Sequence, residues 1–297
     1  MSVPKKHHCV PQFLLRHFAD PSGQLVVHRT DVDRVYRANV RDLGHRNFGH
    51  SLFWPNREPD HVSLEARMTS IEGAAATVVT ELRGSRTRSV TPEQREVLGF
   101  LIALQWARSR FLLMVVRREV LGRDTPVEGT HRSLGLLNIV ATVLEPWAAR
   151  QRDAFDTKER SCVIVDRLES WDWQVYRPTG PKLVIADNVV SMWGVAKGKA
   201  GLAPEAWTRH GIGVGFGTCA RVTVPLAPDL GLVLTPPEQG TRGVSAAEFN
   251  RSTIYNSREF VAHHPAALSD QLQRRLAEDL DTQRWILPHI LEASIVG

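Results

Sequence analysis

A regular spacing of apolar residues between positions 64 and 82 constrains the fold more than any other feature of the sequence. Successive members are separated by four and three residues alternately, which places them along one stripe of an α-helix. Asp60 or Ser63 is a suitable N-cap for this helix. The spacing therefore predicts a helix that buries one face, made of Leu64, Met68, Ile71, Ala75, Val78 and Leu82.

Two more helices are expected in the first half of the chain. The segment Thr91-Pro-Glu-Gln94 has the form of a capping box with proline at the first helical position. It predicts a long helix to about Val120, with inward-facing Leu101, Leu104, Phe111, Met114 and Val115. A third helix is expected from Ser133 to Glu145, where Pro146 would end or kink it.

Short strand-like runs bounded by proline and glycine turns dominate the second half. They are Cys162–Val165, Trp173–Tyr176, Leu183–Ala186, Gly211–Gly217, Val222–Pro225 and Gly231–Leu234. Two earlier runs, Gln24–His28 and Asp33–Arg37, predict a hairpin. The capping box Ser245-Ala-Ala-Glu248 opens a helix to about Ser257, and a last helix begins near Ser269.

The order of these elements, helices first and strands second, indicates an α+β fold rather than a doubly wound sheet. We expect a single α+β domain over residues 1–297. Its amino-terminal helical half, residues 1–155, would pack on a mostly antiparallel sheet. That sheet and its closing helices would form the carboxy-terminal half, residues 156–297.

Composition adds weak limits on partners and location. The net charge is +5 and the pI about 9.4, a positive field that favours anionic partners such as nucleic acid. Cys9, Cys162 and Cys219 are too far apart for a zinc knuckle or a disulfide frame. The sequence contains neither a signal-peptide core nor an apolar stretch of membrane-spanning length, so we expect a cytoplasmic protein without membrane contact. Composition does not predict an oligomeric state.

The opening stretch from His7 to Phe18 combines polar and large apolar side chains. Phe13, Leu14 and Phe18 have helical spacing, and Pro11 suits the first turn. His7 and His8 would then lie in an extended lead-in segment, with Arg16 on the helix. The paired histidines are a solvent-facing pair, or one ring caps a carbonyl, or one of them is a metal ligand or general base. Seven of the twelve histidines lie by position 61, which favours a local cluster.

Six short segments follow one another along most of the chain. They are His8-x-Val-Pro-Gln-Phe-x-Leu-x-x-Phe18, the glutamate-rich helix around Glu65, Gln105-x-x-Arg108, Ile185-Ala-Asp-Asn-Val189, Val224-Pro-Leu-Ala-Pro228, and Asn250 through Tyr255-Asn-Ser257 to Phe260-Val261. Together they resemble a bacterial family known only as domain of unknown function 4238. That family has no settled activity, so the resemblance implies an organisation and not a function.

The candidate site residues come from these segments. His8, Glu65 and Asp187 are the predicted catalytic residues and metal ligands, since oxygen ligands with one imidazole suit Mg²⁺ or Mn²⁺. The predicted substrate-binding residues are Arg16, Gln105, Arg108 and Asn188. Alternatives stay open: Asp187 and Asn188 could form an Asx-turn, and the arginines could be ion-pair partners of Glu65 and Glu72.

Two functions from different classes fit these residues. The first is a metal-dependent hydrolase, a nuclease or phosphodiesterase, in which arginines clamp an anionic substrate. The second is a non-catalytic binding or regulatory module for an anionic ligand or nucleic acid. A ββα-metal nuclease fits less well, because a helix follows Pro11 where a hairpin is required, and Asn47 and His50 are too close together.

Overall fold

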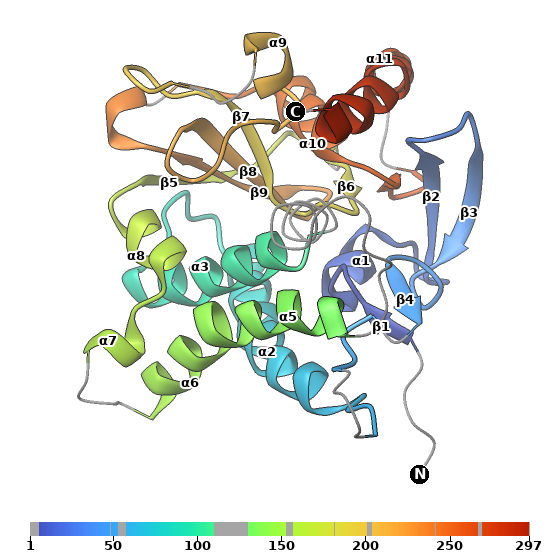
Figure 1. The fold of residues 1–297 in the computed structure, drawn as a ribbon. Helices are drawn as coiled ribbons and strands as arrows, with labels where there is room; N and C mark the ends of the chain where they lie inside the picture. The colour runs from blue at the N-terminus through green and yellow to red at the C-terminus, as the bar shows by residue number, and fades with distance from the viewer. Residues whose placement is uncertain are drawn as a thin grey trace. The chain divides into compact units, whose positions relative to one another are not determined.

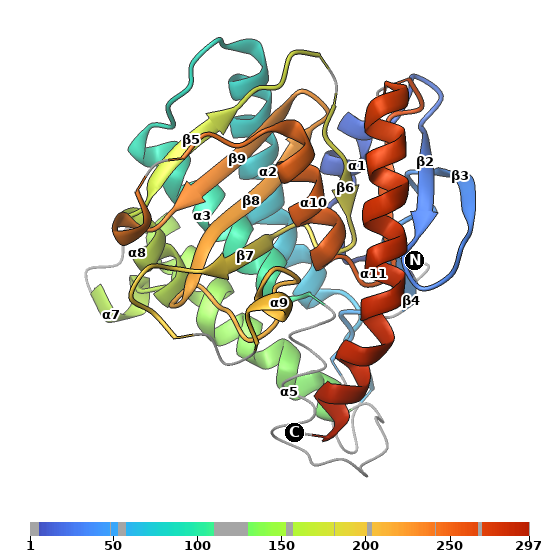
Figure 2. The ribbon, with the colours of Figure 1, turned by 90° about the horizontal axis from the view of Figure 1, so that it is seen from above.

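The computed structural model (Figures 1 and 2) shows an α+β protein in two compact units. It describes residues 6–47, 49–52, 58–109, 130–152, 157–180, 182–200, 204–240, 242–266 and 269–296. None of the helices within these ranges combines the length and the apolar character that a membrane span requires. The α+β class predicted from the order of elements is confirmed. The packing of the two predicted halves as a single domain stays a prediction.

The first unit, here the helical unit, comprises residues 1–11, 44–81 and 92–169. The longest of its described helices, α2 (Ser63–Gly84), lies in this unit up to Glu81, and all six residues of the predicted apolar stripe are buried. It also contains α3 (Pro92–Ala107), α5 (Thr130–Ile139), α6 (Glu145–Gln151), α7 (Thr157–Arg160) and α8 (Val163–Glu169), as Figure 1 shows. It also contains two short antiparallel strands, β1 (Lys6–His8) and β4 (His45–Asn47).

Three expectations for this unit need correction. The helix that begins at Pro92 ends at Ala107 and not near Val120; residues 110–120, with Phe111, Met114 and Val115, lie outside the described residues. Pro146 does not end its helix, because a π-helical turn (Val140–Leu144) precedes it and places it in the first turn of α6. The predicted strand Cys162–Val165 is the start of α8.

The last error has a packing cause. Val163, Ile164 and Val165 are β-branched, and such residues favour strands when only local preference acts. Val165 and Leu168, three residues apart, are buried, and a Cβ added to Gly99 of α3 would lie 3.4 Å from a methyl of Val165. Burial of one helical face against α3 therefore overrides the local preference.

The second unit, here the sheet unit, comprises residues 12–43, 82–91 and 170–297. One of its four-stranded sheets has the order β3–β2–β10–β6, made of Val35–Asn39, Gln24–Arg29, Phe260–His263 and Ile185–Ala186. The other has the order β5–β9–β8–β7, made of Asp172–Tyr176, Leu230–Thr235, Cys219–Ala227 and Ser191–Val195. Every pairing is antiparallel, and the predicted hairpin is the pair β2–β3.

Helices pack on these sheets within the sheet unit. They are α1 (Gln12–Phe18), α9 (Glu205–Thr208), α10 (Ala246–Asn256) and α11 (Asp270–Val296). Figure 2 shows α10 lying across the second sheet with α11 alongside it. The capping box predicted at Ser245 and Glu248 is present at the start of α10. Val184, Ile254, Val261 and Leu280 belong to the apolar core that the closing helices share with β6 and β10.

The predicted strand Gly211–Gly217 is wrong: this segment forms turns and bends. Gly211 and Gly213 have φ angles of 71° and 65°, in the left-handed region that glycine adopts without steric cost. A Cβ at Gly211 would also lie 2.1 Å from Oδ1 of Asn256. The alternating glycines therefore allow a tight turn against α10, in place of a strand.

We expect Leu101→Ala to destabilise the protein by about 2–5 kcal/mol, because Leu101 of α3 is fully buried and its truncation leaves a cavity. Urea denaturation followed by circular dichroism measures the change. The control is Val163→Ala, since Val163 is 75% exposed and its truncation should change stability by less than about 0.5 kcal/mol. Equal midpoints for both variants would contradict the inward orientation of Leu101.

Candidate metal centre

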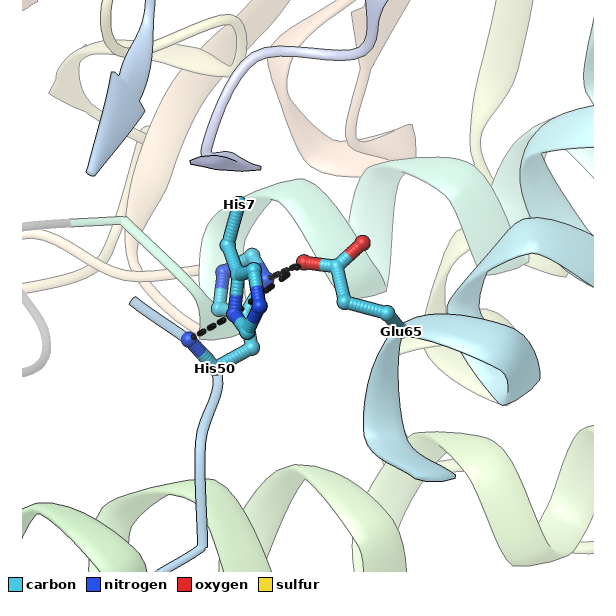
Figure 3. A group of neighbouring side chains, drawn as sticks. All are labelled: His7, His50 and Glu65. Carbon is cyan, nitrogen blue, oxygen red and sulfur yellow. Dashed lines mark hydrogen bonds and ion pairs between the residues drawn. The ribbon is translucent and has the colours of Figure 1, made fainter. Parts of the chain in front are cut away.

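Three side chains of the helical unit converge at one point: His7 of β1, His50 from the turn after β4, and Glu65 in the first turn of α2 (Figure 3). The strand pair brings the two histidines together, because Arg46 lies opposite His7 and the chain then turns back toward it. One potential ligand atom from each residue lies within 4.8 Å of the other two. Figure 3 shows the carboxylate of Glu65 pointing toward the two rings.

The contacts within this cluster define how each ring is used. Nδ1 of His50 contacts Oε1 of Glu65, and Nδ1 of His7 lies 3.8 Å from the same oxygen. The backbone N–H of His50 donates to Nδ1 of His7 over 2.8 Å. The two rings are stacked, with centroids 5.7 Å apart. Both histidines are almost fully buried, whereas the Glu65 side chain is 32% exposed, so the carboxylate lies on the solvent side of the cluster.

Glu65 remains ionised in this setting. Burial acts to raise its pKa, but the hydrogen bond from His50 and the attraction of His50, His7 and Arg108 outweigh burial and lower the pKa below its ordinary value. Because the pKa is lower in the folded state, ionised Glu65 stabilises the fold above its unfolded-state pKa. That contribution is lost as the pH falls through the folded-state pKa.

Arg108 lies just after α3, and its side chain is 1% exposed. One guanidinium nitrogen lies 2.7 Å from Oε1 of Glu72, and another lies 3.8 Å from Sδ of Met68. Glu65, Met68 and Glu72 are spaced along one face of α2. Arg108 is thus an ion-pair partner of a helix glutamate, which is one of the two interpretations left open by the sequence.

The family comparison can be set beside this geometry. A family model described as a protein of unknown function (DUF4238) matches residues 6–267. The chain belongs to this family. A search of curated proteins and a search of solved structures found no match. The matched region contains every candidate site residue named above, and it confirms the resemblance seen in the sequence motifs.

The resemblance to the family rested partly on Asp187, Asn188, Asn250 and Asn256. The side chains of these residues form hydrogen bonds with backbone groups of the sheet unit. Oδ1 of Asp187 accepts hydrogen bonds from the backbone N–H groups of Arg258, Glu259 and Phe260, over 2.9, 3.1 and 3.3 Å. Burial raises the pKa of Asp187, against the lowering effect of the hydrogen bonds from Arg258 and Glu259. The side-chain amide of Asn188 donates to the carbonyl of Asn256 over 3.4 Å.

Asn250 and Asn256 of α10 make similar contacts. Asn250 accepts from the N–H of Val184 and donates to the carbonyl of Lys182. Asn256 binds both backbone groups of Met192 in β7. These motif residues thus connect segments of one unit that are distant in the sequence. The contacts stabilise the fold, because buried backbone groups without hydrogen-bond partners are costly.

The remaining predicted site residues have different surroundings. His8 lies opposite His45 across the β1–β4 pair, and their ring centroids are 5.6 Å apart. Arg16 donates to Oε1 of Gln12 on its own helix over 2.7 Å. Gln105 is buried in α3. His8 and Glu65 belong to the helical unit, and Arg16 and Asp187 to the sheet unit, so a cleft shared by all four stays a prediction.

The sequence-based prediction chose His8, and not His7, as the histidine ligand, and it considered His50 only as part of a ββα-metal motif that fitted less well. The excess of histidine before position 61 was the available signal. Alternation along β1 separates the pair, because neighbouring residues of a strand point to opposite faces. His7 therefore faces Glu65, while His8 faces His45.

Proposed function

We propose that the protein is a metal-dependent hydrolase of an anionic substrate, a phosphodiesterase or nuclease, with His7, His50 and Glu65 as the metal ligands. The observation that carries the proposal is the convergence of two imidazoles and one carboxylate within 4.8 Å. His8 and Asp187, the ligands expected from the sequence, are replaced in this proposal by His7 and His50. Glu65 is common to both.

The donor set determines which ions fit. Two nitrogen donors and one oxygen donor suit the borderline ion Zn²⁺ best. Mn²⁺ is a harder ion but binds imidazole more strongly than Mg²⁺, which prefers oxygen and water. Three protein ligands leave further coordination positions for water or substrate. A metal held there would polarise a phosphoryl oxygen. Binding would replace the direct contact between Nδ1 of His50 and Glu65, and it would compete with the His50 amide for Nδ1 of His7.

The second candidate is a hydrolase that uses no metal. It is supported by the same contact between His50 and Glu65, which could make His50 a general base. If Nδ1 of His50 donates to the carboxylate, its Nε2 carries the lone pair and is suited to general-base catalysis. Glu65 would then hold the ring in the required tautomer, as carboxylates do in catalytic triads. This arrangement needs no ligand rearrangement at His7.

The test is hydrolysis of bis-p-nitrophenyl phosphate and of single-stranded DNA by metal-stripped protein, with and without added Mn²⁺ or Zn²⁺. We expect activity that requires the ion and falls about 100-fold or more in Glu65→Gln, because loss of a partner in the outer shell alone costs metal sites about 10–100-fold in affinity or activity. The matched control is Glu81→Gln, which removes one exposed charge from the same helix and should retain activity.

The other outcomes separate the alternatives. Activity that persists in chelator but disappears in Glu65→Gln would favour the metal-free dyad. Binding of DNA without turnover under any condition would contradict hydrolysis and favour the non-catalytic module.

A further inference from the structure

A pocket of about 530 Å³ lies within the sheet unit, at the β7 edge of the second sheet. Trp193 of β7 and Arg221 of β8 are direct cross-strand partners, so their side chains lie on the same face of the sheet. Thr223 follows on that face, and its hydroxyl donates to Ser252 of α10. The helix therefore packs on the sheet at Thr223, and Arg221, two residues earlier in β8 and on the same face, lines the pocket. Figure 2 shows α9 beside β7 at this edge.

Arg221 is a half-buried cation without a carboxylate partner among the described residues. Its Nε is buried, and no described residue accepts a hydrogen bond from it. The guanidinium carbon lies 6.0 Å from the ring centroid of Trp193. Burial lowers the pKa of Arg221, Glu248 opposes that effect, and Arg242 adds to it. A buried donor with a poorly compensated charge is unfavourable for folding, so its presence in a pocket points to an anionic ligand.

The other charged groups of the pocket are exposed. The lining contains three more cations and one carboxylate: Lys199, Arg209, Arg242 and Glu205. Each of these cations forms an ion pair with a neighbouring glutamate. Lys199 lies 3.7 Å from Glu238, Arg209 lies 3.6 Å from Glu205, and Arg242 lies 2.8 Å from Glu248. Such exposed pairs contribute little energy and rearrange readily when a stronger anion approaches. The lining therefore offers several cations on different sides, which suits a multiply charged anion better than a single carboxylate.

We propose that this pocket binds a phosphorylated small molecule of nucleotide size, with Arg221 as the central phosphate contact. The volume lies within the range typical of small-molecule sites, about 300–1,000 Å³. A guanidinium donates to two phosphate oxygens at once, which a phosphate group accepts in bidentate geometry. This site shares no residue with the His7–His50–Glu65 cluster, and the proposal does not depend on the proposed hydrolase activity.

The test is calorimetric titration of the full chain with pyrophosphate, ATP and adenosine in the presence of EDTA, which prevents binding through the proposed metal. Pyrophosphate and ATP should bind once per chain, and adenosine should not bind. Arg221→Met keeps the aliphatic stem and should weaken phosphate binding about 30-fold or more. The control, Arg37→Met, removes an exposed charge from β3 of the same unit and should change affinity less than about threefold.

Melting temperatures provide a second measurement, which distinguishes a ligand-binding role of Arg221 from a purely structural role. Without ligand, Arg221→Met should melt at or above the wild-type temperature, because it removes a half-buried charge that has no carboxylate in ion-pair contact among the described residues. ATP should raise the melting temperature of the wild type but not of this variant. Failure of the wild type to bind pyrophosphate or ATP, equal losses in both arginine variants, or a lower melting temperature of ligand-free Arg221→Met would overturn the proposal.

Discussion

Replacing His7 with asparagine is expected to weaken binding of Zn²⁺ or Mn²⁺ by more than about 100-fold, since loss of an outer-shell partner alone weakens metal sites about 10–100-fold. Asparagine is chosen because its Oδ1 can still accept the backbone N–H of His50 that Nδ1 of His7 accepts. The variant thus removes the imidazole while keeping the turn after β4. Calorimetric titration of metal-stripped protein measures the affinity.

The matched control is His8→Asn, one residue further along β1. Its ring contacts His45 on the other face of the strand pair, so the change should leave metal affinity within about threefold. Loss of binding in His8→Asn but not in His7→Asn would reject the cluster in favour of the ligand set expected from the sequence. Asp187→Asn extends this comparison, because Asp187 is a ligand only in that second set.

Glu72→Ala is expected to destabilise the protein by about 3–5 kcal/mol, because it leaves the buried guanidinium of Arg108 without its ion-pair partner. The Arg108 side chain is 1% exposed, so in the intact protein its guanidinium depends on Glu72 and not on water for compensation of its charge. The shift in the urea midpoint, followed by circular dichroism, gives the loss of unfolding free energy.

An exposed ion pair on the same helix provides the control. Arg67 of α2 contacts Glu145 at the same distance, 2.7 Å, but the two side chains are 37% and 54% exposed. Arg67→Ala should therefore lower stability by about 1 kcal/mol or less. The double variant Glu72→Gln with Arg108→Met should recover most of the loss, since a buried pair replaced by uncharged side chains is often neutral. A single-variant loss similar to that of Arg67→Ala would show that solvent reaches Arg108.

Only part of the candidate site could be predicted from the sequence. Glu65 was identified because a carboxylate beside an apolar stripe needs a partner, and that reasoning requires only the helical period. The partners were not predictable, because His50 lies 15 residues before Glu65 and 43 residues after His7. Their meeting depends on the pairing of two three-residue strands, which no periodic pattern of that length can specify.

The sequence by itself determined those elements whose identifying pattern involves residues only a few positions apart. The stripe of α2, the capping box at Ser245 and the β2–β3 hairpin are of this kind, and each is confirmed. Each of these signals is carried by residues close in sequence: the helical period, the four residues of the capping box, and two adjacent strands joined by a short turn. Local spacing is therefore sufficient to predict them.

Tertiary structure decided the rest through contacts between distant residues. Packing against α3 made a helix of the β-branched run in α8, and Asn256 packs against the turn at Gly211 where a strand was expected. Strand β10 lies between β2 and β6, although His28 and its partner Val261 are 233 residues apart. The pairing of β1 with β4 likewise selected His7 over His8 as the residue facing Glu65. In each case the deciding free energy comes from burial and backbone pairing with a remote segment, which outweighs local preferences of about 1 kcal/mol or less per residue.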